Sequence, residues 1–191
     1  MSGKKKKWVG ILVALAMVLT MVPSLSWSEV GDETGDGTWT IMEMVNGDYW
    51  IIEYTGPEQE ELTIPSTVGG KPVSGMQWCF RDHPTAKNWL KKVNIEFSGT
   101  IYEGFSGCTA LEKVVLPVGG SMKFASTFEN CINLHSINIE DLTSVEIKDF
   151  VFLRCENLKK VRLPEDAGTY IGQSAFEDSG LEEINFPDSL T

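Results

Sequence analysis

The chain has 191 residues, of which 27 are Asp or Glu and 16 are Lys or Arg, and its formal net charge at pH 7 is −11. A negative charge of this size repels phosphate backbones and anionic lipids, so it argues against nucleic acids and membrane surfaces as partners. The length is enough for one domain with a sizeable hydrophobic core.

The N-terminal segment has the pattern of an export signal. Four lysines at positions 4–7 precede fifteen mostly apolar residues at positions 8–22, and small residues follow in "SLSWS". A transmembrane helix needs about 20 apolar residues, so this length favours a cleaved signal over an uncleaved N-terminal anchor. We predict a signal peptide at residues 1–28, with cleavage after Ser28 or alternatively Ser26. The protein is then expected to be secreted or at the cell surface, with no membrane span after cleavage.

Two short segments separate this signal from the rest of the chain. Residues 29–37 ("EVGDETGDG") are acidic and glycine-rich, which predicts a flexible acidic linker. The spacing from Asp32 to Glu43 is similar to that of a calcium loop, but a strand pattern follows it, so we favour the solvated linker. Residues 38–61 contain two runs rich in β-branched and aromatic residues around Asn46-Gly47, which predicts an N-terminal β-hairpin cap with a two-residue turn.

The segment from residue 62 to residue 191 is repetitive. Five phenylalanines recur at steps of 25, 23, 24 and 24 residues, namely Phe80, Phe105, Phe128, Phe152 and Phe176. Each is followed by a leucine and then by two apolar residues with one residue between them, which is typical of a short strand with one buried face. A period of 20–29 residues indicates a leucine-rich solenoid, so we predict a β-rich repeat solenoid of about five repeats of 23–25 residues.

The motifs "FSGCTALEKVVLP", "FENCINLHSINI", "AFEDSGLEEINFP" and "IPSTVGGKPV" resemble the BspA-like leucine-rich repeats of secreted and surface bacterial proteins. The resemblance implies a right-handed superhelix and a role in adhesion or in host or matrix binding, and it supplies no catalytic residues. Three features depart from the pattern: His83 replaces the repeated cysteine, "PTAKNW" adds four residues, and Ser179 stands in the last cysteine position. No capping unit follows "FPDSLT", so we expect the repeats to continue beyond Thr191.

Three of the four cysteines, Cys108, Cys131 and Cys155, share one position in the repeat and should stack in a column. Adjacent strands lie about 4.8 Å apart, whereas a disulfide prefers a Cβ separation of about 3.8 Å. We therefore favour a column of buried free thiols over a disulfide, and we expect Cys79 to be a packed small residue too.

The sequence offers little for catalysis or metal binding. It contains two histidines, His83 and His135, and neither a Cys-x-x-Cys nor a Gly-x-Ser-x-Gly motif. A zinc site needs converging Cys or His ligands, and nucleophilic catalysis needs a Ser or Cys beside a His with an orienting acid. We predict no catalytic residues, no metal and no cofactor, and hence a protein that is not an enzyme.

The outward residues of the repeated strands are the candidate ligand-binding face. They form two columns, Lys92, Lys113, Ser136, Lys160, Glu183 and Asn94, Val115, Asn138, Arg162, Asn185. With Lys91 and Lys159, they should make a locally basic, Asn-lined surface on an acidic body. The insertion at residues 81–89 is a second candidate, because repeat insertions map to loops on one face, often the binding face.

These observations favour an exported, non-catalytic leucine-rich-repeat protein that binds another protein or a surface glycan. Two alternatives stay open: the targeting or adhesion module of a larger secreted enzyme, and a structural component of the cell envelope.

Overall fold

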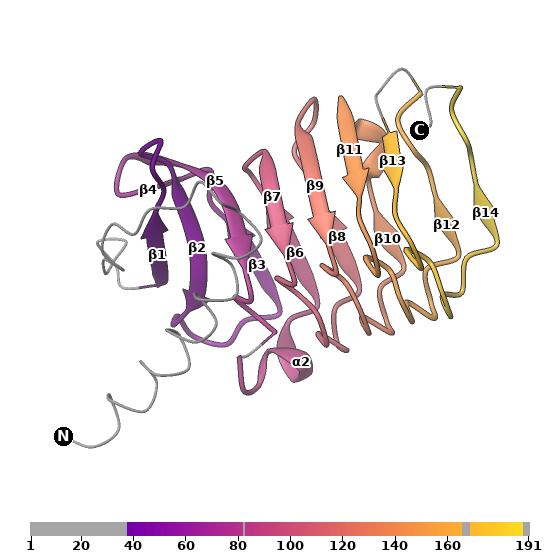
Figure 1. Cartoon of the computed structure of the whole chain (residues 1–191). Coiled ribbons are helices and arrows are strands. Elements are labelled where there is room, and N and C mark those ends of the chain that lie inside the picture. Colours follow the sequence, from indigo (N-terminus) through magenta and orange to yellow (C-terminus); the bar gives the residue numbers. More distant parts are fainter. Residues whose placement is uncertain (1–37, 82, 166–168, 189–191) are drawn as a thin grey trace.

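The computed structural model describes residues 38–81, 83–165 and 169–188. These residues form a β-solenoid whose coils stack in chain order from the indigo to the yellow end (Figure 1). The predicted signal peptide and acidic linker lie outside the described residues, as does most of the calcium-like spacing. Glu43, the last residue of that spacing, forms an ion pair with Lys71 at 3.2 Å.

One side of the solenoid is a long sheet with the strand order β1-β2-β5-β7-β9-β11-β13. Its strands are β1 (Trp39–Glu43), β2 (Tyr49–Tyr54), β5 (Lys71–Gln77), β7 (Gly99–Tyr102), β9 (Ser121–Ala125), β11 (Ser144–Ile147) and β13 (Thr169–Ile171). From β2 to β13 all pairings are parallel, and the short strand β4 (Thr67–Val68) pairs antiparallel with β5.

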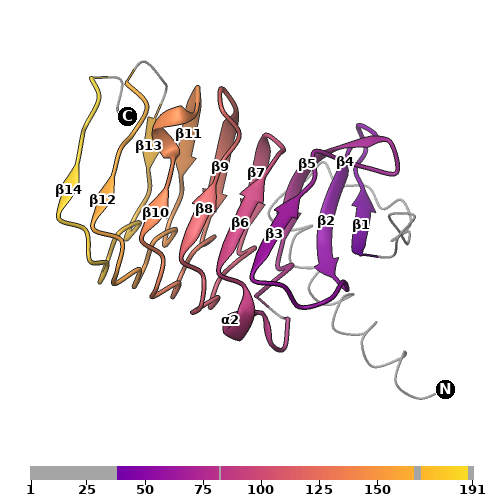
Figure 2. The ribbon, with the colours of Figure 1, turned by 180° about the vertical axis from the view of Figure 1, so that it is seen from behind.

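The other side consists of short parallel strands, as Figure 2 shows from behind. Four strands pair in the order β10-β8-β6-β3, and two more pair with each other, β12 with β14. Their bounds are β3 (Glu61–Ile64), β6 (Lys92–Ile95), β8 (Lys113–Val115), β10 (Ser136–Ile137), β12 (Lys160–Val161) and β14 (Glu183–Ile184). β3 precedes Phe80, the first of the repeated phenylalanines, and adds one more strand to this side.

Each coil therefore holds two strands, where the sequence analysis expected one. From β7 onward, a long-sheet strand leads to the repeated phenylalanine, a turn carries the cysteine and leucine, and a short strand completes the coil. The strand before each phenylalanine was missed. Its signal is a pair of buried apolar residues two positions apart, as in Met122 and Phe124 or Val145 and Ile147.

The core consists of columns of equivalent side chains. The rings of the five repeated phenylalanines stack nearly parallel, with centroids 5.2–5.7 Å apart. Phe128, Phe152, Leu134 and Leu158 are fully inaccessible to solvent, as the repeat alignment predicted. Because each coil buries its apolar face on an equivalent neighbour, the columns hold the two strand sides at a fixed separation.

The N-terminal hairpin is present, but its turn differs from the prediction. β1 and β2 pair antiparallel. Gly47 N–H donates to Met44 O, and Met44 N–H donates to Asp48 O, both at 2.8 Å, so three residues (45–47) form the loop. Gly47 has φ +83°, which matches a three-residue hairpin loop with its last residue in the left-handed region.

Helix is scarce in this structure. The described residues contain one short α-helix, α2 (Ala86–Trp89), and one 3₁₀ turn, η1 (Ile139–Asp141). Within the described part of the chain, no helix is long and apolar enough to cross a membrane.

Candidate binding surface

The short strands place the predicted ligand-binding residues in rows that run along the solenoid. The register aligns Glu61 with Lys92, Lys92 with Lys113, and Lys113 with Ser136. Further along, Lys160 aligns with Glu183. In the second row, Asn94 aligns with Val115. The strands thus bring the predicted columns together on one face.

Most cations of this face are paired with carboxylates. Ion pairs join Lys91 to Glu60 at 2.6 Å, Lys92 to Glu61 at 3.0 Å, Lys159 to Glu182 at 3.4 Å, Lys160 to Glu183 at 2.5 Å and Arg162 to Glu183 at 3.8 Å. The glutamates were not part of the predicted basic surface, apart from Glu183. Charges of both signs therefore alternate over the face, and it is less basic than its lysines alone suggested.

Two of these pairs shift the pKa of a partner. The hydrogen bond from Lys160 lowers the pKa of the Glu183 carboxyl, and the hydrogen bond to Glu60 raises the pKa of Lys91. Both pairs are exposed, so solvent and salt screen them.

Lys113 differs from the other cations of this face. It is exposed at the centre of the row, with Lys92 on one side and Ser136 on the other. Among the described residues, Lys113 has no ion-pair partner within 4.0 Å. Its ammonium group is therefore available for a ligand carboxylate.

Two of the predicted asparagines have a structural role. The Asn138 side chain accepts a hydrogen bond from Leu116 N–H at 2.7 Å and donates one to Leu116 O at 3.2 Å. Asn185 makes the same two bonds to Leu163, at 2.6 and 3.0 Å. Each side-chain amide pairs with the N–H and the C=O of one residue in the preceding coil, as the backbone of a neighbouring strand would, and so links two coils. Asn138 and Asn185 are therefore committed to the fold, and Asn94, Val115 and Ser136 are half-buried between the charged positions.

The insertion at residues 81–89 packs closely against the solenoid. Its helix α2 buries Ala86 and Trp89. His83, which stands where later repeats have cysteine, accepts hydrogen bonds at Nδ1 from Thr85 N–H (3.4 Å) and Ala86 N–H (3.2 Å). The next coil also contacts it, since Ala110 N–H donates to Lys87 O at 3.0 Å. The insertion thus has a clear packing role, and Lys87 and Asn88 are among its exposed residues.

All four cysteines are free and buried, in agreement with the predicted packing column. The Cys131 thiol donates to Phe105 O and the Cys155 thiol to Phe128 O, each at 3.2 Å. Burial raises the pKa of all four thiols, to about 12 for Cys108 and Cys155. No described cluster of three or more His, Cys, Asp or Glu side chains is arranged to hold a metal ion. His135 is exposed.

The family model of the BspA-type leucine-rich repeat region matches residues 89–191 in six copies. The chain belongs to the BspA-type leucine-rich repeat family. The six copies exceed the five repeats counted from the phenylalanines. A comparison with curated proteins gave no match.

Two solved structures share the fold of this BspA-type chain. The T. pallidum leucine-rich repeat protein superposes with a TM-score of 0.65 at 23% identity, over 82% of this chain and 72% of that protein. A leucine-rich cell surface protein from Faecalibacterium prausnitzii gives a TM-score of 0.57 at 22% identity, over 86% of this chain and 50% of that protein. At these identities the likeness concerns the fold.

Proposed function

We propose that this BspA-type protein is exported and acts without catalysis, binding a protein partner through its short-strand face. Family membership supports a role in interaction, because solenoids use their repeated exposed surfaces for binding. The F. prausnitzii protein of the same fold is described as a cell surface protein, and the export signal predicted at residues 1–28 fits the same location.

The observation that carries this proposal is the position of Lys113. It is an exposed cation in the row that runs from Glu61 to Ser136, while Lys92 beside it and Lys160 further along the solenoid are neutralised by glutamates. A partner with an acidic side chain over Lys113 and polar groups over the flanking pairs would match this pattern of charge. Such a face determines which partner is accepted and how fast it binds more than it determines raw affinity.

Charge reversal tests the proposed face. The variants Lys92→Glu, Lys113→Glu, Lys160→Glu and Arg162→Glu would be measured by surface plasmon resonance against purified fibronectin, laminin and collagen. Lys113→Glu should weaken the binding of the recognised protein at least about tenfold, because it places a carboxylate where the ligand carboxylate lies. Thermal stability should change little, since exposed substitutions usually stay within about 0.5 kcal/mol.

Lys87→Glu on the insertion is the matched control, because it makes the same charge change on another exposed surface. If the four variants keep full affinity and Lys87→Glu loses it, the binding site lies on the insertion. If none of these three matrix proteins binds, the matrix binding that the family resemblance implies is wrong for this chain.

The proposed export has its own test. N-terminal sequencing of protein recovered from the culture medium or cell surface should show Trp27 or Glu29 as the first residue. Material that begins at Met1 would contradict cleavage.

A further inference from the structure

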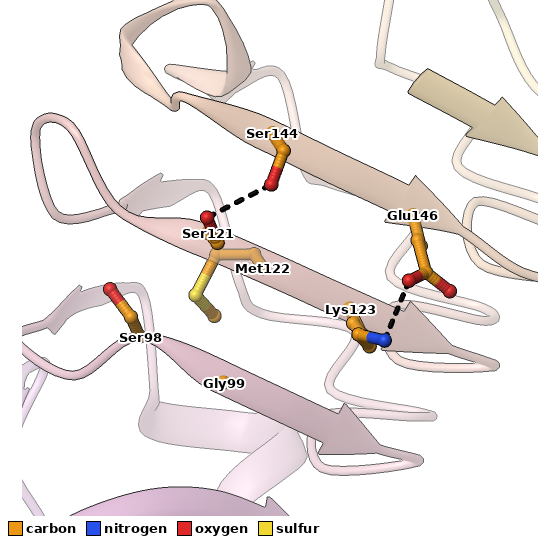
Figure 3. Close-up of a pocket in the computed structure, with 7 residues that line it drawn as sticks. All are labelled: Ser98, Gly99, Ser121, Met122, Lys123, Ser144 and Glu146. Atoms are coloured by element: carbon orange, nitrogen blue, oxygen red, sulfur yellow. Dashed lines mark hydrogen bonds and ion pairs between the residues drawn. The ribbon is translucent and has the colours of Figure 1, made fainter. Parts of the chain in front are cut away.

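The outward face of the long sheet carries a shallow hollow of about 260 Å³ across β7, β9 and β11 (Figure 3). This face is separate from the short-strand face and includes none of the residues predicted from the sequence. Three serines, one from each successive coil, line one side of the hollow: Ser98, Ser121 and Ser144. Lys123 and Glu146 line the other side.

The serines form a row of hydroxyls across the strands. Ser121 and Ser144 are in register, and Ser144 Oγ donates to Ser121 Oγ at 2.9 Å. Ser98 continues the row on the neighbouring coil, because Gly99 is in register with Met122. A hydroxyl carries one donor and two acceptor positions, so this row keeps hydrogen-bonding capacity for a ligand. Its members recur at the strand spacing of about 4.8 Å.

The charged side of the hollow is a closed triad. Lys123 Nζ lies 2.6 Å from one carboxylate oxygen of Glu146, and Lys148 Nζ lies 2.7 Å from the other. Both oxygens of the carboxylate are thus engaged, and both ammonium groups are held by it. The triad offers fixed N–H donors rather than an open cation, which favours a neutral polar ligand over an anion.

Aromatic rings lie on both sides of the hollow. Tyr170 is in register with Glu146, and Lys148 Nζ lies 4.6 Å from the centre of its ring. On the opposite side, Tyr102 follows Thr100 on the same face of β7, and its ring centre is 6.0 Å from that of Trp78. Such rings combine an apolar face with a polar tip, which suits contact with a molecule that has both characters.

Two hydrogen-bond donors beside Tyr102 are unused. Gln77 is in register with Tyr102 and 1% exposed, and among the described residues its Nε2 has no hydrogen-bond partner. Trp78 Nε1, next to it, likewise has no partner in the described part of the chain. Buried donors are normally satisfied, so these two mark polar groups beneath the aromatic pair that solvent does not reach.

The sheet itself restricts what this ligand is. β7, β9 and β11 are paired on both edges, so their backbone groups are not free to receive a peptide as an added strand. Binding must use hydroxyls, fixed N–H donors and ring faces. We propose that this face binds a neutral glycan chain, lying across the strands from the Trp78–Tyr102 pair to Tyr170, with the serine row along one side of it. The inference goes beyond the short-strand function and does not depend on it.

Native gels containing mannan, xylan or laminarin test this proposal with the full chain. At least one of these neutral polysaccharides should retard the wild-type protein. The double variant Ser121→Ala/Ser144→Ala and the single variant Tyr102→Ala should each raise the apparent Kd about tenfold or more. Ser136→Ala, which removes a hydroxyl from the opposite face, should keep wild-type retardation.

Tyr102→Phe separates loss of contact from misfolding, because it keeps the ring and should retain most of the binding that Tyr102→Ala loses. Any variant that unfolds is recognised by circular dichroism and replaced by its conservative form. Wild-type protein that none of the three polysaccharides retards overturns the proposal. Retardation by heparin alone also overturns it, because the ligand would then be anionic. Binding of a protein partner to the short-strand face should be unchanged in the serine variants, so the two proposals fail independently.

Discussion

The middle coils of the solenoid repeat one set of buried side chains, whereas the first coil keeps the phenylalanine and the leucine but has a histidine at the cysteine position. In the middle coils (residues 99–161), Phe, Cys and Leu recur in stacked columns. In the first coil (residues 71–95), an imidazole replaces the thiol and a short helix is added. Its core is a cluster of rings, namely Trp39, Tyr54, Phe80, His83 and Trp89.

The difference follows from what covers each coil. A middle coil is covered on both sides by a copy of itself, so identical side chains in register fill the space between coils. The first coil has the antiparallel hairpin on one side, and the shape of that hairpin does not repeat. Aromatic rings bury much area in varied orientations, and here they meet at interplanar angles from 38° to 87°. The buried side chains of the middle coils are thus determined by the repeat, whereas those of the first coil are determined by the N-terminal hairpin that covers it.

Alkaline pH should act most strongly on the middle coils. Burial raises the pKa of Cys108 and Cys155 from 9.0 to about 12. Unfolded thiols ionise above about pH 8.5 while the folded ones stay neutral, so the unfolded state then binds fewer protons. Stability is complete below that pH and should fall from about pH 9 to about pH 12, by about 1.4 kcal/mol per pH unit for each thiol. Urea denaturation at a series of pH values measures this slope. A Cys108→Ala/Cys155→Ala variant should show a shallower slope, and an unchanged slope would contradict the assignment.

Replacing Leu134 by Ala should destabilise the protein by about 2–5 kcal/mol, because it leaves a cavity between two coils. Leu134 is fully buried, whereas Leu181 in the last described coil is half-buried. Leu181→Ala is the matched control and should cost clearly less. Equal losses in chemical denaturation would show that position along the solenoid does not matter.

The columns could be predicted from the sequence because each position returns with the same chemistry every 23–25 residues. The phase of Phe128, Cys131 and Leu134 relative to their equivalents fixed which side chains stack, and the structure buries all three completely. The predicted outward rows also lie on one face, because strand alternation alone determines them.

The role of Asn138, the ion pairs of the lysines and the hollow on the long sheet could not be predicted, because they depend on contacts between coils that a repeat pattern does not encode. Asn138 was read as an outward ligand residue, but its amide binds the backbone of Leu116, which lies 22 residues earlier. The glutamates that neutralise the lysines come from neighbouring coils, as Glu61 does for Lys92. The hollow on the long sheet was missed because two of its serines, Ser121 and Ser144, fall in strands that the repeat pattern did not predict.

Replacing His83 by Ala tests the first coil and should destabilise it by about 1–3 kcal/mol. The change removes the acceptor of two backbone N–H groups, from Thr85 and Ala86, and a ring that contacts Trp89. Hydrogen exchange should become faster at these two amides and stay unchanged in the middle coils. His135→Ala, at an exposed position, is the control and should stay within about 0.5 kcal/mol of wild type. Uniformly faster exchange would show that the first coil is not an independent unit.

The smallest expected effect lies within the thiol column itself. Serine at position 131 or 155 meets the carbonyl that the thiol already binds, Phe105 O or Phe128 O. The thiol of Cys108 has no such bond among the described residues. A buried hydroxyl without a partner costs about 1–3 kcal/mol, so Cys108→Ser should reach that range. Cys131→Ser should cost less by about 1 kcal/mol, the net value of one hydrogen bond. Urea denaturation of the two single variants measures this difference. Equal costs would mean that the carbonyl does not accept from the serine, and that the column is held by packing alone.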